Sequence, residues 1–185
     1  YEKVISDMIN TPQTNTQNVL EHGISVAKHF DKLISGDTNN WKLPTWFIDN
    51  KELILNNLHS LEDIKEYHVM HDCGKSYCMT IDEQGKRHFT NHSQVSFDTF
   101  SKISDNKVVA DLILKDMVLH TIKSDEVEDF IKNNSIKTVI TLLVTALCEL
   151  HSNASMFGGT ESTSFKIKFK QLDKRGKQIL KLINK

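Results

Sequence analysis

A short string near the middle of the chain combines residue types that bind metal ions. His71-Asp72-Cys73-Gly74-Lys75 places an imidazole next to a carboxylate at the end of an expected helix. Neighbouring His and Asp side chains at a helix end can reach the same ion, and this donor pair suits Fe, Mn, Zn, Co or Ni. The pair alone also fits an ordinary helix C-terminus, so evidence for a metal site must come from the rest of the chain.

Three further histidines strengthen the metal interpretation. His22 falls within an expected helix upstream. His92 begins the next helix, 21 residues after His71, and His120 lies near the end of the following helix, 49 residues after His71. A single histidine beside apolar neighbours is usually an interior or surface residue. One candidate ligand on each of four successive helices instead favours a shared metal site.

This pattern resembles the HD-domain superfamily of metal-dependent phosphohydrolases over residues 15–155. The string from His71 to Lys75 looks like the family's His-Asp-x-Gly-Lys. The resemblance implies a helical bundle, and the two additional histidines are similar to the dinuclear branch, in which the Asp bridges two metal ions. The residues that match the pattern are His22, His71, Asp72, His92 and His120.

The last ligand departs from the family pattern. The family carries Asp on the final core helix, whereas this chain offers Glu149 there. Glu is one methylene longer and ligates the same metals, and a buried carboxylate needs a partner because an unpaired buried charge is costly. Glu149 could instead face solvent or pair with a lysine, and Asp111 is then the alternative ligand.

The resemblance implies an enzyme that uses two divalent metal ions. We expect a phosphohydrolase that cleaves a phosphate ester of a nucleotide or related small molecule through a metal-bound hydroxide, formed because metal binding lowers the pKa of water to about 7. The resemblance implies that Asp72 bridges the two metal ions and that Lys75 binds a phosphate oxygen of the substrate. Lys75 also fits an ordinary solvated lysine. His92 is either a ligand or a proton donor.

Two other histidines are candidates for contact with ligands or substrate. His68 lies three residues before His71 on the same helix face, where it either orients a ligand or is simply interior. His151 follows Glu149 by two residues and could face the substrate.

The elements that must position these residues are mostly helical. Gly36 is the expected stop of the first helix, Gly85 the expected turn of a hairpin, and residues 135–151 form the most apolar and central helix. The fold prediction is all-α, an HD-like bundle with a small hairpin, in which residues 1–155 form the metal domain and 156–185 a basic extension packed on it. The expected helices are 17–35, 50–58, 61–69, 91–103, 105–122, 124–133 and 135–151, with N-caps at Thr16, Asn50, Ser60, Asn91, Asp105, Ser124 and Ser135.

The C-terminal segment is rich in basic residues and is the second part of the chain that could bind phosphate. Residues 165–185 contain eight basic residues against Asp173 alone. Strict alternation from Phe165 to Lys170 predicts a strand with lysines on one side. Lys166 and Lys168 would then bind phosphates of the substrate or of RNA or DNA, or else form a charged edge that resists aggregation.

Composition limits the class of protein. The 185 residues suit one domain, and a net charge of −1 means that the molecule as a whole is not a generic polyanion binder. No apolar run approaches the length of a transmembrane helix. Three cysteines cannot form a disulfide framework, which favours a reducing, cytoplasmic location.

Two other functions remain open at this level. A minority of HD proteins with a similar ligand set use a mixed-valent diiron pair and oxygen to cleave C–C or C–P bonds. The basic tail also fits a phosphatase or phosphodiesterase of nucleic-acid ends, or a binding module without catalysis.

Overall fold

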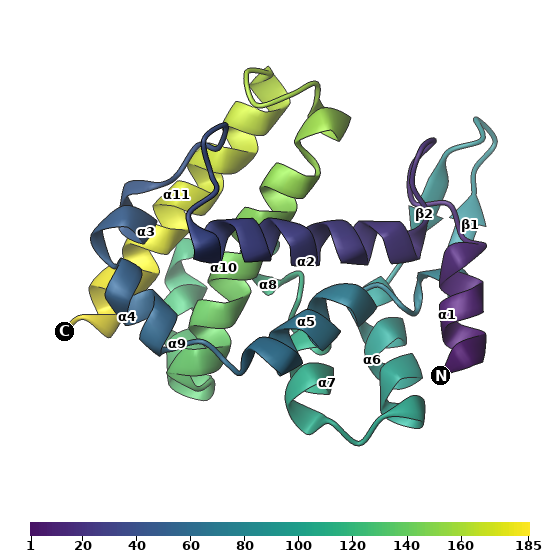
Figure 1. Ribbon diagram of the computed structural model, residues 1–185, viewed down its shortest axis with the longest axis horizontal. Coiled ribbons are helices and arrows are strands. Elements are labelled where there is room, and N and C mark those ends of the chain that lie inside the picture. The colour runs from purple at the N-terminus through teal and green to yellow at the C-terminus, as the bar shows by residue number, and fades with distance from the viewer. The chain divides into compact units, whose positions relative to one another are not determined.

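The computed structural model describes residues 1–185, and most of the chain is helical with one two-stranded antiparallel hairpin (Figure 1). The predicted all-α fold with a small hairpin is confirmed. The chain forms two compact units: unit 1 contains residues 1–27 and 62–117, and unit 2 contains residues 28–61 and 118–185. The division predicted at residue 155 stays a prediction. No helix has both the length and the apolar character needed to cross a membrane.

Unit 1 contains the hairpin and the helices around it. Its core includes Ile64, Tyr67, Met70, Phe100 and Leu112, all fully buried. Its elements are α1 (Glu2–Ile9), the first half of α2 (Val19–Ser35), α5 (Leu61–Met70), the 3₁₀ turn η1 (Lys75–Tyr77), β1 (Met79–Ile81), β2 (Arg87–Phe89), α6 (His92–Ile103) and α7 (Lys107–Leu114).

The hairpin follows the prediction. Met79 pairs with Phe89 and Ile81 with Arg87. Gly85 has a φ of +78°, a conformation that L-residues rarely adopt, and the Asp82 carboxylate accepts backbone N–H groups of the turn. The side chain of Asp82 and the glycine therefore fix the turn together.

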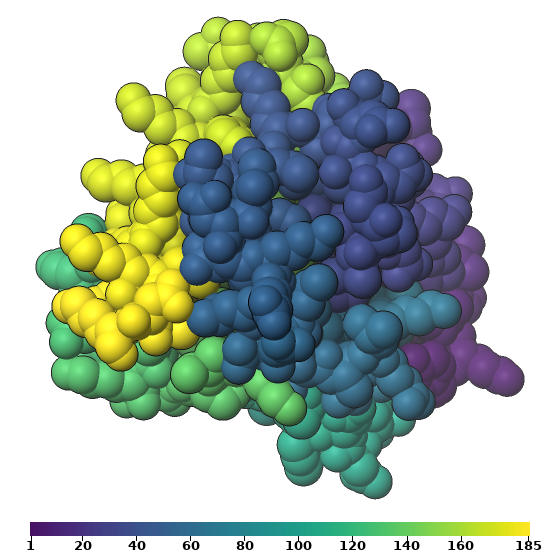
Figure 2. Space-filling view, turned by 60° about the vertical axis from the view of Figure 1, so that its left-hand side comes forward, coloured from purple at the N-terminus to yellow at the C-terminus, as the bar shows by residue number.

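Unit 2 is built around α10, the helix expected to be the most buried. Every residue from Thr138 to His151 is buried, and α11 packs alongside α10 (Figure 1). The C-terminal end of α11 lies at the surface beside residues near 50, where Asn184 donates a hydrogen bond to Asn50 (Figure 2). The elements are the second half of α2, α3 (Thr45–Asp49), α4 (Lys51–Asn56), α8 (Val118–Thr121), η2 (Ser124–Glu126), α9 (Val127–Asn133), α10 (Ile136–Ser152), η3 (Ala154–Phe157) and α11 (Thr163–Ile183).

Helix α2 starts later than predicted, and Thr16 is not its cap. Asn18 caps it instead: the Asn18 side chain accepts the N–H of Glu21, and the Glu21 carboxylate accepts the N–H of Asn18, both at 2.8 Å. Gly36, with a φ of +82°, ends the helix as predicted. Asn18 caps the helix better than Thr16 would, because the reciprocal hydrogen bonds satisfy two backbone N–H groups at once.

The helix predicted over 105–122 is in fact two helices, α7 and α8. The break falls at Lys115–Met117, where the Asp116 carboxylate turns into the core and accepts the hydroxyl proton of Tyr67. The cap of α7 is Asn106, whose side chain accepts the N–H of Val109, rather than Asp105.

Among the other predicted caps, Ser135 is confirmed as the cap of α10. The Ser135 hydroxyl accepts the N–H of Thr138 at the start of α10. Asn91 adopts a left-handed conformation with no side-chain cap, and Ser124 lies inside η2, which Lys123 precedes.

The strand predicted at Phe165–Lys170 is wrong, because this segment is the first part of α11. Alternation would need Ile167 to be buried with Phe165, but Ile167 is 54% exposed. Burial instead recurs at Phe165, Leu172 and Ile179, every seventh residue, which is a helical spacing. The Ser162 hydroxyl caps the helix by accepting the N–H of Phe165.

Candidate metal centre

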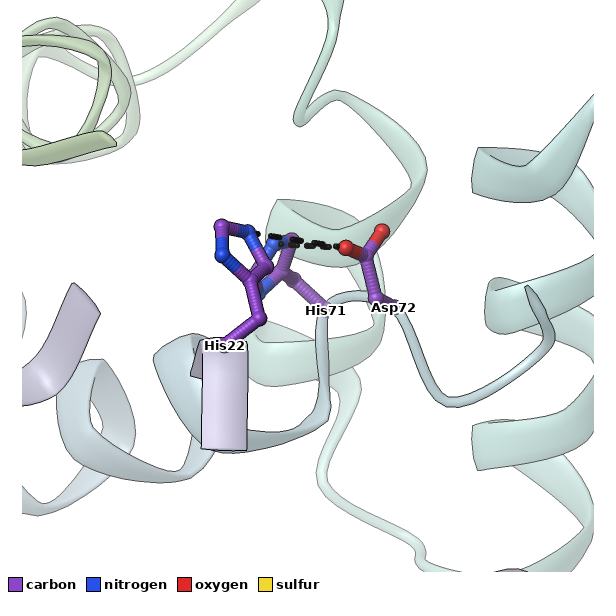
Figure 3. A group of neighbouring side chains, drawn as sticks. All are labelled: His22, His71 and Asp72. Carbon is purple, nitrogen blue, oxygen red and sulfur yellow. Dashed lines mark ion pairs between the residues drawn. The ribbon is translucent and has the colours of Figure 1, made fainter. Parts of the chain in front are cut away.

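The clearest group of side chains that could hold a metal ion lies in unit 1 and consists of His22, His71 and Asp72 (Figure 3). One donor atom from each lies within 4.8 Å of the other two, and all three side chains are buried. Nε2 of His71 and Nε2 of His22 lie 3.2 and 3.7 Å from Oδ2 of Asp72. A buried group of two imidazoles and a carboxylate could hold a metal ion.

Helix α2 brings His22 to the site through a close approach of two backbones. The next residue is Gly23, and a Cβ at this position would lie 2.4 Å from the carbonyl oxygen of Val69 on α5. Only glycine permits this contact. His22 is therefore held against the end of α5, directly before the chain reaches His71 and Asp72.

A tight turn carries His71 and Asp72 from α5 toward α6. The N–H of Gly74 donates to the hydroxyl of Ser96 at 2.9 Å, and a Cβ on Gly74 would lie 2.4 Å from the Ser96 nitrogen. The glycine of the His-Asp-x-Gly-Lys string is thus where the turn docks on α6. His92, the first residue of that helix, is brought to Asp72 from the other side.

Two of the imidazoles are oriented by main-chain carbonyls. Nδ1 of His71 donates to the carbonyl oxygen of His68 at 2.7 Å, and Nδ1 of His92 donates to that of Phe89 at 3.1 Å. A carbonyl only accepts, so each Nδ1 carries a proton and the neutral ring has its lone pair on Nε2. Metal-binding histidines are commonly held in this way.

Asp72 presents a different oxygen to each side of the site. Oδ2 faces His22 and His71, whereas Oδ1 lies 3.6 Å from Nε2 of His92 and accepts no hydrogen bond although it is buried. Burial lowers the pKa of His92, so its Nε2 lone pair is present at neutral pH. Asp72 therefore has imidazole Nε2 atoms facing both of its carboxylate oxygens.

Lys75 lies against the same carboxylate. Helix α5 ends at Met70, and the turn brings Nζ of Lys75 to 2.8 Å from Oδ2 of Asp72 and 3.1 Å from Oε1 of Gln13. Burial acts to raise the pKa of Asp72, but the neighbouring His71 imidazole and Lys75 ammonium outweigh it and hold the pKa well below the usual range. Asp72 is therefore a carboxylate at neutral pH.

Asp116 is a residue of this region that the sequence did not reveal. Its carboxylate is buried, accepts the hydroxyl proton of Tyr67, and has an oxygen within 4.8 Å of a ring nitrogen of His71. In the sequence, Asp116 falls in the middle of an expected helix, where an acidic residue normally faces solvent. Only the break between α7 and α8 turns it inward.

The structure places the remaining two predicted ligands in unit 2. Nε2 of His120 on α8 lies 3.1 Å from Oε2 of Glu149 on α10. The Glu149 carboxylate is therefore buried and pairs with a histidine. The alternative ligand, Asp111 in unit 1, is 41% exposed at its side chain and pairs with Lys115 at 2.6 Å.

The predicted substrate contacts are placed as follows. His68 is buried on α5 and supports His71 through its backbone carbonyl. His151 in unit 2 donates from Nε2 to the carbonyl of Lys42 and stacks on Trp41, with ring centroids 4.4 Å apart. Lys166 and Lys168, also in unit 2, are exposed residues of α11.

Comparisons with protein-family models, curated proteins and solved structures give no significant match to this chain. What the structure itself establishes is a mostly helical protein with buried His, Asp and Glu side chains that could hold a metal ion.

The three free cysteines give a first prediction, because their environments differ. Burial, helped by the negative charge of Asp72, raises the pKa of Cys73 to about 12, and burial raises that of Cys148 well above its usual range. Burial also raises the pKa of Cys78, but this thiol is only partly buried and a reagent can reach it. Since the thiolate is the reactive form, we expect one thiol per native chain to react with an aromatic disulfide reagent at pH 8, and all three in denaturant.

Mass spectrometry of the labelled protein identifies the reactive residue. Cys78→Ser should leave the native protein nearly unreactive, whereas Cys148→Ser should not change the native count. Rapid labelling of Cys73 in the folded protein would contradict the burial of the turn that carries Asp72.

Proposed function

We propose that this protein is an HD-type metal-dependent phosphohydrolase that acts on a phosphate ester of a nucleotide or similar small molecule. The observation that carries the proposal is the environment of Asp72: a buried carboxylate in a His-Asp-x-Gly-Lys turn, with imidazole Nε2 atoms facing both of its oxygens. A structural ion pair would need only one of these imidazoles.

The proposed ligands fall into two groups around Asp72. His22, His71 and Oδ2 of Asp72 would hold one divalent ion, and His92 with Oδ1 of Asp72 would contribute to a second. The ligand roles of His120 and Glu149 remain part of the prediction from sequence. Divalent ions at such a site lower the pKa of water and offset the negative charge of a phosphate group.

The protein's own groups prepare the site for an anion. The carbonyls of His68 and Phe89 hold the rings of His71 and His92 with their lone pairs toward Asp72. The ammonium of Lys75 has three N–H donors, and Asp72 and Gln13 accept two of them. Nζ also lies 5.0 Å from the centroid of the Phe89 ring, and a substrate phosphate oxygen would take the third donor in place of that contact.

Metal analysis followed by a phosphate-release screen tests the proposal. Protein stripped with a chelator is reloaded with Mn, Fe, Co, Ni or Zn, and bound metal is counted by mass spectrometry. Each loaded form is then assayed on nucleoside mono-, di- and triphosphates and on phosphorylated oligonucleotides. Metal-dependent phosphate release supports the proposal, a chain that binds none of these metals contradicts it, and oxygen uptake by the iron form would favour the diiron oxygenase.

A substitution of Lys75 separates substrate binding from metal binding. Lys75→Ala should reduce kcat/KM by roughly 10- to 150-fold, since a hydrogen bond to a charged group contributes about 1.5–3 kcal/mol. Bound metal should not fall, because the substitution removes a cation from beside Asp72 rather than a ligand. Lys86→Ala, in the exposed hairpin turn, is the matched control. Loss of metal from the Lys75 variant would instead assign the lysine a structural role.

A further inference from the structure

Helix α11 carries a row of exposed lysines that the predicted strand did not reveal. At 100° per residue, spacings of four, four, three and four place five lysines within about 80° of the helix circumference. All five are exposed (Figure 2 shows side chains of this C-terminal segment standing out from the surface). We call this row the basic ridge; it consists of Lys166, Lys170, Lys174, Lys177 and Lys181.

The two other cations of α11 point elsewhere and are already engaged. Nζ of Lys168 lies over the ring of Phe157, 5.1 Å from its centroid. Nε of Arg175 donates to the carbonyl of Ile122 at 3.0 Å. The opposite face of the helix is buried in unit 2 through Phe165, Leu172, Gly176, Ile179 and Leu180. The helix is therefore fixed about its own axis, with the ridge outward.

Carboxylates offset only part of the charge on the ridge. Lys177 pairs with Asp173 at 2.9 Å, and Lys166 pairs with Glu161 at 3.2 Å. Lys170, Lys174 and Lys181 form no ion pair. Unit 2 as a whole has fifteen basic against eleven acidic residues, whereas the complete chain has a net charge of −1. The excess of positive charge is thus local to the unit that bears the ridge.

We propose that the basic ridge binds the phosphate backbone of nucleic acid without regard to sequence. From Lys166 to Lys181 the ridge is about 22 Å long, with ammonium groups about 4.5–6 Å apart along the axis. The backbone of a nucleic-acid strand offers a phosphate every 3.4 Å of axis, so each lysine can find one. The ridge has no Arg, Asn, Gln or aromatic side chain for reading bases, and contacts to phosphate position a nucleic acid without specifying its sequence.

An anionic membrane fits this surface less well. A helix that binds a lipid surface buries an apolar face among the headgroups while its basic face stays polar. In α11 the apolar face is already packed inside unit 2. Ile167 alone among its large apolar residues is mostly exposed, at 54%. A nucleic acid needs only the outward row of charges, and the inference is independent of the hydrolase proposed for unit 1.

The test measures binding of the full chain to a labelled duplex of about 20 base pairs, and to the matching single strand, over a series of salt concentrations. Five phosphate contacts predict a slope of log K against log[salt] of about −4.5 for the duplex and about −3.5 for the single strand. In the variant Lys170→Gln/Lys174→Gln/Lys181→Gln, the duplex slope should fall to about −1.8 and affinity at low salt by at least about 100-fold.

The control changes the same charge elsewhere on unit 2. Lys32→Gln/Lys51→Gln/Lys137→Gln replaces three exposed lysines of other helices and should leave the slope unchanged. Thermal unfolding confirms that both triple variants fold. Equal losses in the two variants, a wild-type slope near zero, or stronger binding to vesicles containing phosphatidylserine than to either nucleic acid would overturn the proposal.

Discussion

Asp72→Asn is expected to abolish tight metal binding, with an affinity loss greater than about 100-fold, since changes to groups that merely orient ligands already cost 10- to 100-fold. The substitution keeps the shape of the side chain and removes the charge that His22, His71, His92 and Lys75 surround. Phosphate release by the proposed hydrolase should fall in proportion to the loss of bound metal. Calorimetric titration with Mn or Zn and metal analysis after dialysis measure the effect.

The variant also leaves the buried ammonium of Lys75 without its carboxylate, which is itself destabilising. Asp72→Asn/Lys75→Met removes both charges and separates metal binding from folding. Asp111→Asn is the control, because this exposed carboxylate of the same unit pairs only with Lys115. Retention of full metal binding by the folded double variant would exclude Asp72 as a ligand.

Gly74→Ala is expected to destabilise the protein by about 3 kcal/mol or more, because overpacking against backbone atoms cannot be relieved by a side-chain rotation. The added Cβ would lie 2.4 Å from the nitrogen and 2.7 Å from the Cα of Ser96. For a chain of this size, the unfolding midpoint should fall by roughly 6–12 °C. Thermal denaturation followed by circular dichroism measures the change.

Gly85→Ala is the control that separates this steric clash from the conformational cost of replacing a glycine. Gly85 has a φ of +78° but open space around its Cβ position, so its substitution should cost only about 1–2 kcal/mol of backbone strain. Equal losses of stability in the two variants would contradict the close contact between Gly74 and the backbone of Ser96 on α6. Metal affinity should fall in Gly74→Ala alone, because only that turn carries Asp72.

Local signals in the sequence were sufficient for much of the fold. The hairpin around Gly85, the end of α2 at Gly36 and the buried helix α10 all depend on short-range patterns, and each is confirmed. The strand predicted at Phe165–Lys170 failed because six residues carry too little information to separate a period of two from one of 3.6. The break at Asp116 depends on its tertiary partner Tyr67, which no local pattern reveals.

Part of the candidate site could also be predicted from the sequence. The grouping of His22, His71, Asp72 and His92 follows the sequence prediction, since each lies on a helix or directly after one, where a motif could mark it. The contact between Lys75 and Asp72 was not predicted, because it depends on a turn whose shape is set by docking on α6.

The contact of Gly23 with α5 also bears on how such a site could be recognised in other chains. Position 23 bears no functional group, yet a saturation-mutagenesis library should tolerate almost nothing there, since any side chain would meet the carbonyl oxygens of Val69 and His68. A tolerance map would then score this glycine like a ligand. A search profile that pairs His-Gly on one helix with His-Asp-x-Gly-Lys after another would describe the packing of two backbones as well as the metal donors, and would be more selective than either motif alone.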